Sequence, residues 1–237
     1  MNVFIKGDED MPKIIEDVEN RILRAARERL LGGDLSSFSA RGIAEDCGIA
    51  VGTMDFTTQG WKAEGLGQVS LMKAAGMGGA MGMTSLIVNP MEIDAPLFNL
   101  DIIALPGKKM LYMELYDTLL NAKRTESIFA AIRDDFGDIM DVPGKPCWYD
   151  HIRYAASVTK CAVAGQEGRL DELMARYGQE YIDLLKDARL CDPAAKKVKA
   201  DAYRDGLLEH GGPATDAFLK VWGKERTGEL FSKVLFG

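Results

Sequence analysis

The clearest structural signal in the chain is the stretch Ala95-Pro-Leu-Phe-Asn-Leu-Asp-Ile-Ile-Ala-Leu-Pro-Gly-Lys-Lys-Met-Leu-Tyr-Met-Glu-Leu-Tyr116. Two apolar runs, residues 95–105 and 110–116, flank a turn at Pro106-Gly107. Proline presets φ there and glycine can adopt a positive φ, so the stretch predicts a β-hairpin. A third short apolar run, residues 83–88, stops just before Pro90 and predicts a buried strand that precedes the hairpin.

Helical periodicity dominates the chain on both sides of these strands. Apolar residues recur at helical spacing among charged ones, which is typical of amphipathic helices. The pattern predicts helices over residues 11–31, 39–47, 64–75, 171–188, 194–210 and 214–221.

The order helices, strands, helices predicts an α/β fold with layers around an antiparallel meander. The chain has 237 residues and no linker rich in proline, serine or glycine, so we expect one domain over residues 1–237. Within it we expect a helical N-terminal part (10–47), a sheet core (about 48–165) and C-terminal helices (170–237).

Composition narrows the function classes. The net charge of −7 argues against a general nucleic-acid binder. The four cysteines stand singly, without a spacing that would suggest a metal site, and no metal is expected. No apolar run approaches the roughly 20 residues of a spanning helix, and the N-terminus lacks a signal-peptide pattern, so the expectation is a cytoplasmic protein with no membrane partner.

Residues 22–56 resemble the helix-turn-helix of TetR-type repressors, through Ile43-Ala44-Glu45, Gly48-Ile49 and Gly52-Thr53. The recognition helix would then cover residues 51–58. That segment contains Asp55 and no lysine or arginine, so it offers no bidentate donor for guanine. A DNA-binding regulator is therefore kept only as an alternative function.

Two separated segments resemble the ferredoxin-dependent bilin reductases. The first runs from Ile87-Val88-Asn89-Pro90 through the strand that contains Asp101 to Leu105-Pro106-Gly107. The second is the C-terminal pattern Gly212-Pro213-Ala214, Phe218, Trp222-Gly223-Lys224-Glu225 and Val234-Leu235-Phe236. A weaker element, residues 135–140, lies between them, and the three follow one another in the order that the family shows.

The resemblance implies a three-layer α/β/α sandwich, in which helices flank a central antiparallel sheet on both sides. It also implies that a linear tetrapyrrole (a bilin such as biliverdin) binds between the sheet and the C-terminal helices. No bound metal or flavin is implied. Reduced ferredoxin, or a flavodoxin, would deliver electrons one at a time, and carboxyl groups and water would supply the protons.

Asp101 is the acid that the resemblance marks as proton donor. Its place in an apolar strand is costly unless the carboxyl group is neutral, hydrogen-bonded or open to a cavity. A four-residue loop at 106–109, or a two-residue loop at Gly107-Lys108, places Glu114 opposite Asp101, and that proximity would raise one pKa. A bulge would move Glu114 to the other face. Alternatively, Asp101 pairs with Lys108 or Arg133.

Other family positions differ here. The histidine found in some members falls near Ser85, and the family's second aspartate falls at Gly212. Three alternatives then remain: a single two-electron reduction that uses Asp101, a replacement donor such as Asp216 or His210, or a protein that binds a bilin without reducing it. Further residues expected at the substrate are Ser85, Asn99 and His151, and the basic run Lys196, Lys197, Lys199 and Arg204 is either a solvated face or a docking patch for an acidic ferredoxin.

Overall fold

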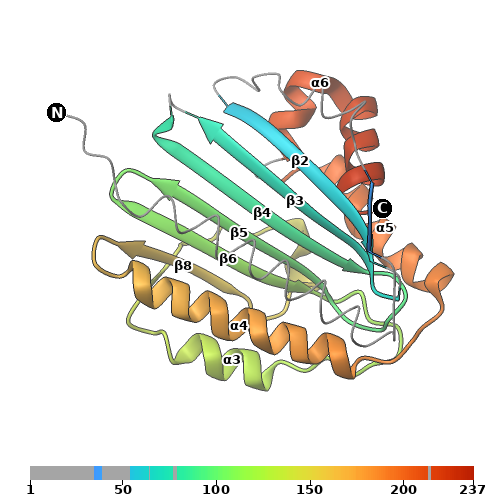
Figure 1. The fold of residues 1–237 in the computed structure, drawn as a ribbon, viewed down its shortest axis with the longest axis horizontal. Coiled ribbons are helices and arrows are strands. Elements are labelled where there is room, and N and C mark those ends of the chain that lie inside the picture. The colour runs from blue at the N-terminus through green and yellow to red at the C-terminus, as the bar shows by residue number, and fades with distance from the viewer. Residues whose placement is uncertain (1–34, 39–53, 64, 77–78, 213–214) are drawn as a thin grey trace.

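The structure is a computed structural model, and it describes residues 35–38, 54–63, 65–76, 79–212 and 215–237. Within these ranges an eight-stranded antiparallel sheet has the strand order β1-β2-β3-β4-β5-β6-β8-β7 (Figure 1). The strands are β1 (Leu35–Phe38), β2 (Met54–Ala63), β3 (Gly67–Gly76), β4 (Met81–Pro90), β5 (Leu97–Leu105), β6 (Lys108–Tyr116), β7 (Met140–Asp141) and β8 (Val158–Val163).

Helices cover both faces of this sheet. They are α3 (Ser127–Asp134), α4 (Glu167–Asp187), α5 (Pro193–His210) and α6 (Thr215–Leu230), with a short 3₁₀ turn η2 (Trp148–His151) and a π-helical turn η3 (Phe231–Leu235). Helices α3 and α4 lie on one face, and α5 and α6 lie on the other side (Figure 1). The described residues thus form the three-layer α/β/α sandwich that the resemblance implies.

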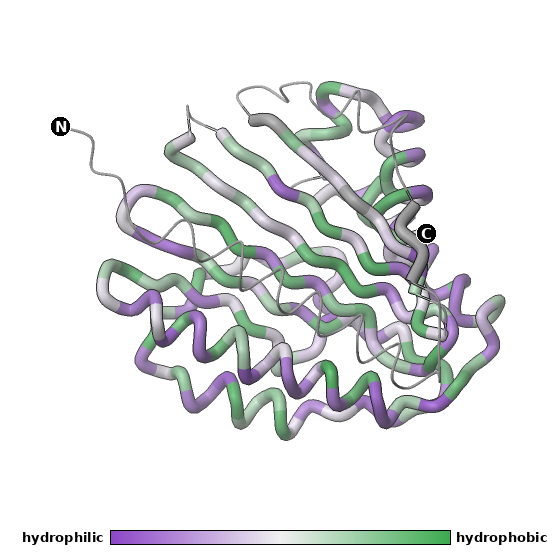
Figure 2. The backbone as a smooth tube through the Cα atoms, in the orientation of Figure 1, coloured by the Kyte–Doolittle hydropathy of each residue, from purple (hydrophilic) through white to green (hydrophobic). Residues whose placement is uncertain are grey.

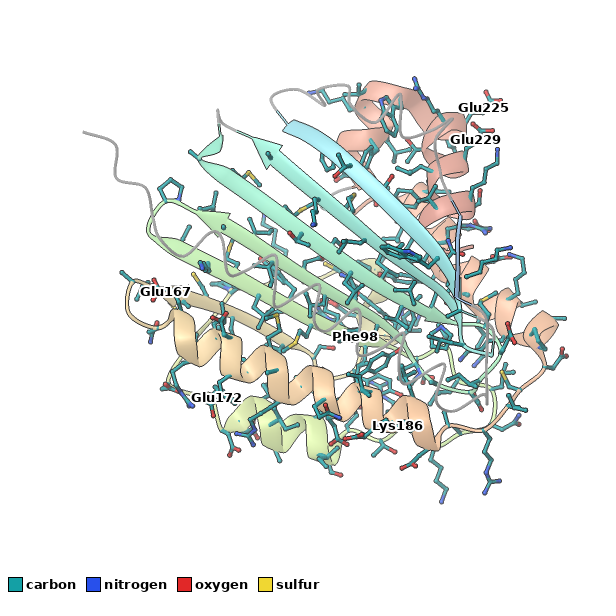
Figure 3. The ribbon with its side chains drawn as sticks, in the orientation of Figure 1. Phe98, Glu167, Glu172, Lys186, Glu225 and Glu229 are labelled. Atoms are coloured by element: carbon teal, nitrogen blue, oxygen red, sulfur yellow. The ribbon has the colours of Figure 1, made fainter. Side chains whose placement is uncertain are left out.

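Each strand contributes alternate side chains to the two faces, because successive side chains of a strand point to opposite sides. Phe98, Leu100 and Ile102 of β5 pack toward α4, where Phe98 stacks on Tyr181 at 4.5 Å between ring centroids. In Figure 3 Phe98 lies between sheet and helix, whereas Glu172 is on the outer side of α4. Apolar colour accordingly follows the central strands in Figure 2, and α4 alternates between polar and apolar positions.

The opposite face holds a second apolar cluster. Leu97 of β5 and Ile87 of β4 belong to it, and the C-terminal helices contribute Leu207, Phe218 and Phe231. The two clusters together explain why the central strands carry apolar residues on both faces and show no clear alternation of polar and apolar positions. They also leave the odd-numbered positions of β5, including Asp101, beneath the C-terminal helices.

Six of the strands and helices expected from the sequence are present in this fold. The strands expected at residues 83–88, 95–105 and 110–116 are confirmed as β4, β5 and β6, and the helices expected at 171–188, 194–210 and 214–221 are confirmed as α4, α5 and α6. The helices expected at 11–31 and 39–47 lie outside the described residues. β1 falls inside the part 10–47 for which helix was expected.

The helix expected at residues 64–75 is wrong, because most of that segment is strand β3. Leu71, Met72 and Ala74 favour helices intrinsically, but β3 pairs along its whole length with both β2 and β4, and this tertiary pairing overrides local propensity. The repressor alternative is overturned by similar evidence: residues 54–58 of its recognition helix form strand β2.

Candidate functional site

A cavity of about 370 Å³ lies between the sheet and the C-terminal helices, and its volume is typical of a small-molecule site. Its floor contains one row of paired residues across five strands, in the order Met72, Ser85, Asp101, Tyr112 and Thr159. Its walls are largely apolar and aromatic, and they include Ile87, Leu97, Ile103, Tyr149, Tyr203, Leu207, Phe218, Phe231, Leu235 and Phe236.

The hairpin β5–β6 sets which polar groups reach this cavity. Leu105 pairs with Lys108, so the loop has only two residues, Pro106 and Gly107, and Gly107 has a φ of 78° that suits glycine. This register places Asp101 opposite Tyr112 and Glu114 opposite Asn99.

The predicted direct pairing of Asp101 with Glu114 is therefore wrong. The loop is one residue earlier than Gly107-Lys108, and this shifts the partner by two positions along β6. A shift of two residues preserves the face of the strand, so Glu114 still lines the same cavity, diagonal to Asp101. The β5–β6 pairing is continuous, and the bulge that would have turned Glu114 away is not present between these strands.

The Asp101 carboxyl group is half-buried on the cavity floor. Asn99 Nδ2 donates a hydrogen bond of 2.7 Å to Asp101 Oδ2. Burial raises the pKa of Asp101 to about 6 against its usual 3.8, the hydrogen bonds from Ser85 and Asn99 act in the opposite direction, and the nearby Glu114 adds to the rise. The group can therefore exchange a proton near neutral pH.

Glu114 has a different environment. Arg153 Nη1 donates to one carboxylate oxygen at 2.8 Å, and the Tyr116 hydroxyl donates to the other at 2.7 Å. The same guanidinium forms an ion pair with Asp150 at 2.8 Å, and its pKa is raised by its contacts with Glu114 despite partial burial. Both oxygens of Glu114 are thus engaged as acceptors, and Glu114 is better suited to orient Arg153 than to donate a proton.

The other predicted site residues divide into two groups. Ser85 and Asn99 line the cavity beside Asp101, and Ser85 Oγ lies 3.5 Å from Asn99 Oδ1. His151, His210 and Asp216 are exposed and do not line it.

Each of these three outer residues has a local structural contact. The His151 ring nitrogen Nδ1 lies 2.8 Å from the Trp148 carbonyl oxygen. The His210 ring packs on Trp148 at 5.6 Å between ring centroids, and Asp216 accepts a hydrogen bond from the Gly212 amide at 3.3 Å. They end up outside the cavity because a short turn and two helix termini carry them to the surface, so the proposed replacement donors are not at the site.

Several site residues were missed at the sequence level. Tyr112 lies two residues before Glu114 in β6, so the two side chains point to the same face of the sheet. A loop of Pro106 and Gly107 would have been enough to place Tyr112 opposite Asp101. Arg153 follows η2 and is brought to the cavity only by the tertiary fold. The remaining polar or reactive residues that line the cavity are Lys145, Cys147, Tyr149, Thr159, Tyr203 and Thr215.

The basic residues of α5 are neither all exposed to solvent nor all free of contacts with neighbouring groups. Lys196 is completely buried and donates to backbone carbonyl groups, while Lys199 donates to the Leu119 carbonyl oxygen. Lys197 and Arg204 both contact Asp201. Neighbouring acids and carbonyl groups therefore satisfy much of this charge, which removes the main feature of the docking patch suggested by sequence.

Two kinds of feature are absent from the described part of the chain. No group of three or more histidine, cysteine, aspartate or glutamate side chains there is arranged to hold a metal ion. None of the helices there combines the length and the apolar character that crossing a membrane requires.

Comparison with known proteins gives a structural relative. No protein-family model matches the sequence, and no curated protein matches it. Among solved structures, the chain is similar to phytochromobilin synthase from tomato, crystallised in complex with biliverdin, with a TM-score of 0.61 and 10% sequence identity. The match covers 91% of this chain and 84% of that one, so the two share the fold over most of their length.

Proposed function

We propose that the cavity binds a linear tetrapyrrole of the biliverdin type, and that the protein reduces it with electrons from an external one-electron carrier such as reduced ferredoxin. The observation that carries the proposal is Asp101: a half-buried carboxyl group with a pKa of about 6, on the floor of an otherwise largely apolar cavity. The shared fold with a protein crystallised with biliverdin supports the choice of ligand.

The reaction adds two electrons and two protons to one double bond of the bilin. Each electron makes the bilin more basic, and an acid must then protonate it at one position. In the proposed step the O–H bond of Asp101 breaks, a C–H or N–H bond forms on the bilin, and water restores the proton to the carboxylate. Asn99 holds the carboxyl group of Asp101 in place through its 2.7 Å hydrogen bond to Oδ2.

The cavity walls suit the rest of such a ligand. Aliphatic and aromatic side chains from the sheet and the C-terminal helices would cover the faces of the pyrrole rings. Lys145 and Arg153 provide cations at the same cavity for the carboxylate groups that a biliverdin-type molecule carries.

Binding and reduction are tested separately. Addition of biliverdin to the full chain is expected to change the bilin absorbance spectrum in a saturable way. Anaerobic addition of reduced ferredoxin should then bleach the long-wavelength band, and omission of ferredoxin should leave it intact. An unchanged spectrum on mixing would remove the bilin from the proposal altogether.

A bilin carrier is the second candidate function. The observation that favours it is the shortage of proton donors in the cavity. Ser85 lies near the position of the family's histidine, Gly212 is at the position of its second aspartate, and Asp216 lies outside the cavity. Saturable binding without any ferredoxin-dependent bleaching would establish the carrier in place of the reductase.

The reduction rate should depend on pH through Asp101. Only its protonated form can donate, and with a pKa of about 6 roughly one molecule in ten is protonated at pH 7. The rate limited by this proton is therefore expected to be highest below pH 6 and to fall about tenfold for each pH unit above it. Single-turnover rates between pH 5 and pH 8 measure this, and the residual rate of Asp101→Asn, which should lack the decline, is the control. A wild-type rate that rises with pH would contradict the assignment.

A further inference from the structure

The cavity contains a second group that can release a proton beside Asp101. Tyr112 is paired directly with Asp101 across β5 and β6, and the next residue in the row is Thr159 of β8. All three line the cavity. Side chains paired in this way have Cβ atoms about 5 Å apart, so a planar ligand that lies over Asp101 also lies over Tyr112.

The Tyr112 hydroxyl has no strong acceptor in the described part of the chain. Its hydrogen bond there goes to the sulfur of Met110, at 3.8 Å. Thioether sulfur is a weak acceptor, so the O–H proton remains available to a ligand. The Tyr112 side chain is half-buried and lines the cavity.

The other tyrosines near the cavity occupy different positions relative to Asp101. Tyr116 donates its proton to Glu114, whereas Tyr149 lies in η2 and Tyr203 in α5, so neither is paired with Asp101 in the sheet. Glu114 itself accepts from Arg153 and Tyr116. Tyr112 is thus distinguished from them by its direct pairing with Asp101 across β5 and β6.

We propose that Tyr112 is the second proton donor of the reduction, placed beside Asp101 in the same cross-strand row. This inference rests on the proposed function, because it concerns the second of the two protons that the bilin takes up. The external carrier supplies both electrons. In the step assigned to Tyr112 its O–H bond breaks, a C–H or N–H bond forms on the bilin, and water returns a proton to the tyrosinate.

Tyr112 also remains protonated at pH values at which Asp101 is largely ionised. Burial and the neighbouring Asp101 and Glu114 raise the pKa of Tyr112 above 10, so its proton is present throughout the pH range in which Asp101 loses most of its own. Water that reaches the open cavity can restore both groups between turnovers.

The test compares Tyr112→Phe with wild type in anaerobic single turnovers driven by reduced ferredoxin. Tyr112→Phe is expected to bind biliverdin normally, to take up one proton, and to form final product roughly 10²-fold more slowly, with a bilin radical visible meanwhile by electron paramagnetic resonance. Met110→Leu is the matched control, because it removes the sulfur acceptor and leaves the hydroxyl in place. It should turn over like wild type.

The outcomes separate the inference from the function on which it rests. Formation of the same product at the wild-type rate by Tyr112→Phe would overturn the role of Tyr112 while leaving the reductase intact. Failure of wild type itself to reduce bound biliverdin would overturn the function. If Tyr112→Phe binds poorly, site-specific replacement by 3,5-difluorotyrosine keeps the shape and makes the phenol more acidic. The second step should then slow at high pH, where this phenol is ionised, and an unchanged pH profile would again overturn the role.

Discussion

Asp101→Asn is expected to slow bilin reduction by roughly 10²- to 10⁴-fold, the usual contribution of a positioned general acid, with bilin affinity unchanged. The amide is nearly isosteric with the carboxyl group, and its oxygen can still accept the hydrogen bond from Asn99 Nδ2. It cannot deliver an acidic proton. After one electron the variant should therefore hold a bilin radical, which stopped-flow absorbance and electron paramagnetic resonance would detect.

A measurement of stability distinguishes the loss of the proton donor in Asp101→Asn from unfolding of the variant. The pKa of Asp101 is about 6 in the folded protein and 3.8 ordinarily, so the stability that the neutral carboxyl group contributes is present below about pH 4 and is lost as pH rises to 6. An asparagine cannot ionise. At about pH 8 the variant should accordingly be more stable than wild type, by on the order of 2 to 3 kcal/mol in urea unfolding.

Asp183→Asn is the matched control for both measurements. This aspartate is half exposed on α4, on the opposite side of the sheet, where it pairs with Lys186. It should leave the reduction rate unchanged, and it should not make the protein more stable at about pH 8. A fully active Asp101→Asn protein would show that another group donates the proton.

The central hairpin could be predicted from sequence almost completely, whereas its register could not. Apolar runs around Pro106-Gly107 are enough to predict two paired strands. Three loops are compatible with those residues, and the choice among them decides whether Asp101 faces Glu114 or Tyr112. In the structure the loop is Pro106-Gly107, and it pairs Asp101 with Tyr112 of β6, while Ser85 of β4 is paired with Asp101 on the other side.

Local patterns failed where tertiary contacts override them. Residues 67–76 have the composition of a helix, yet they form a central strand because two neighbouring strands pair with them. His210 and Asp216 are predicted as proton donors because they are acid–base residues near a family motif. Residue type does not determine which side of a helix end faces the cavity, so this prediction could not place them. Lys196 shows the same limit: its charged neighbours suggest a surface residue, and only the fold reveals that it is completely buried.

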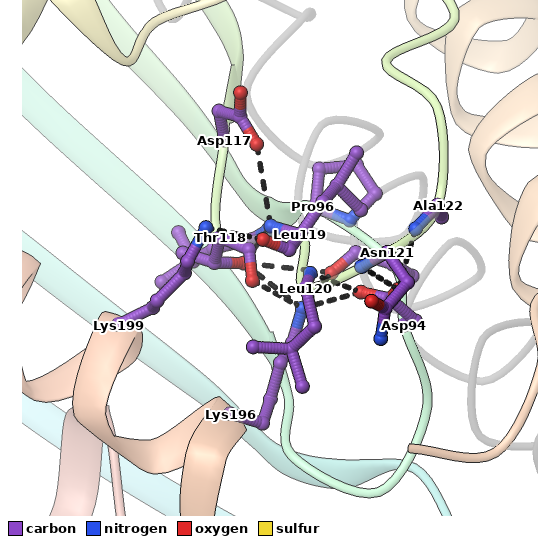
Figure 4. Close-up of polar contacts among 12 residues, drawn as sticks. Asp94, Pro96, Asp117, Thr118, Leu119, Leu120, Asn121, Ala122, Lys196 and Lys199 are labelled. Atoms are coloured by element: carbon purple, nitrogen blue, oxygen red, sulfur yellow. Dashed lines mark hydrogen bonds and ion pairs between the residues drawn. The ribbon is translucent and has the colours of Figure 1, made fainter. Parts of the chain in front are cut away.

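Lys196→Met is expected to lower the stability of the protein by about 2 to 4 kcal/mol, because it leaves buried polar groups without a partner. Lys196 Nζ donates to the carbonyl oxygens of Ala95 and Thr118, at 2.6 and 2.8 Å, and to Thr118 Oγ1 at 3.2 Å (Figure 4). It also lies 3.8 Å from a carboxylate oxygen of Asp94.

Asp94 ties the same site to the following loop. Its carboxylate accepts from the backbone amides of Leu120, Asn121 and Ala122 at 2.7 to 2.8 Å (Figure 4). These amides and Lys196 lower its pKa in spite of its burial. The cluster fixes the start of β5 and the chain just after β6, so it holds in place the two strands that carry Asp101 and Tyr112.

Lys197→Met is the control for Lys196→Met, since Lys197 is the adjacent residue and is exposed. It contacts Asp201 at 2.8 Å and the Gly237 carbonyl oxygen at 3.4 Å. Its replacement should change stability by no more than about 0.5 kcal/mol. Burial lowers the pKa of Lys196 to about 8 from the usual 10.5, so this lysine makes wild type more stable as pH rises between those values. The methionine variant should lack that rise. Equal urea midpoints for the two variants would show that the cluster contributes little, and that other contacts hold β5 and β6 in register.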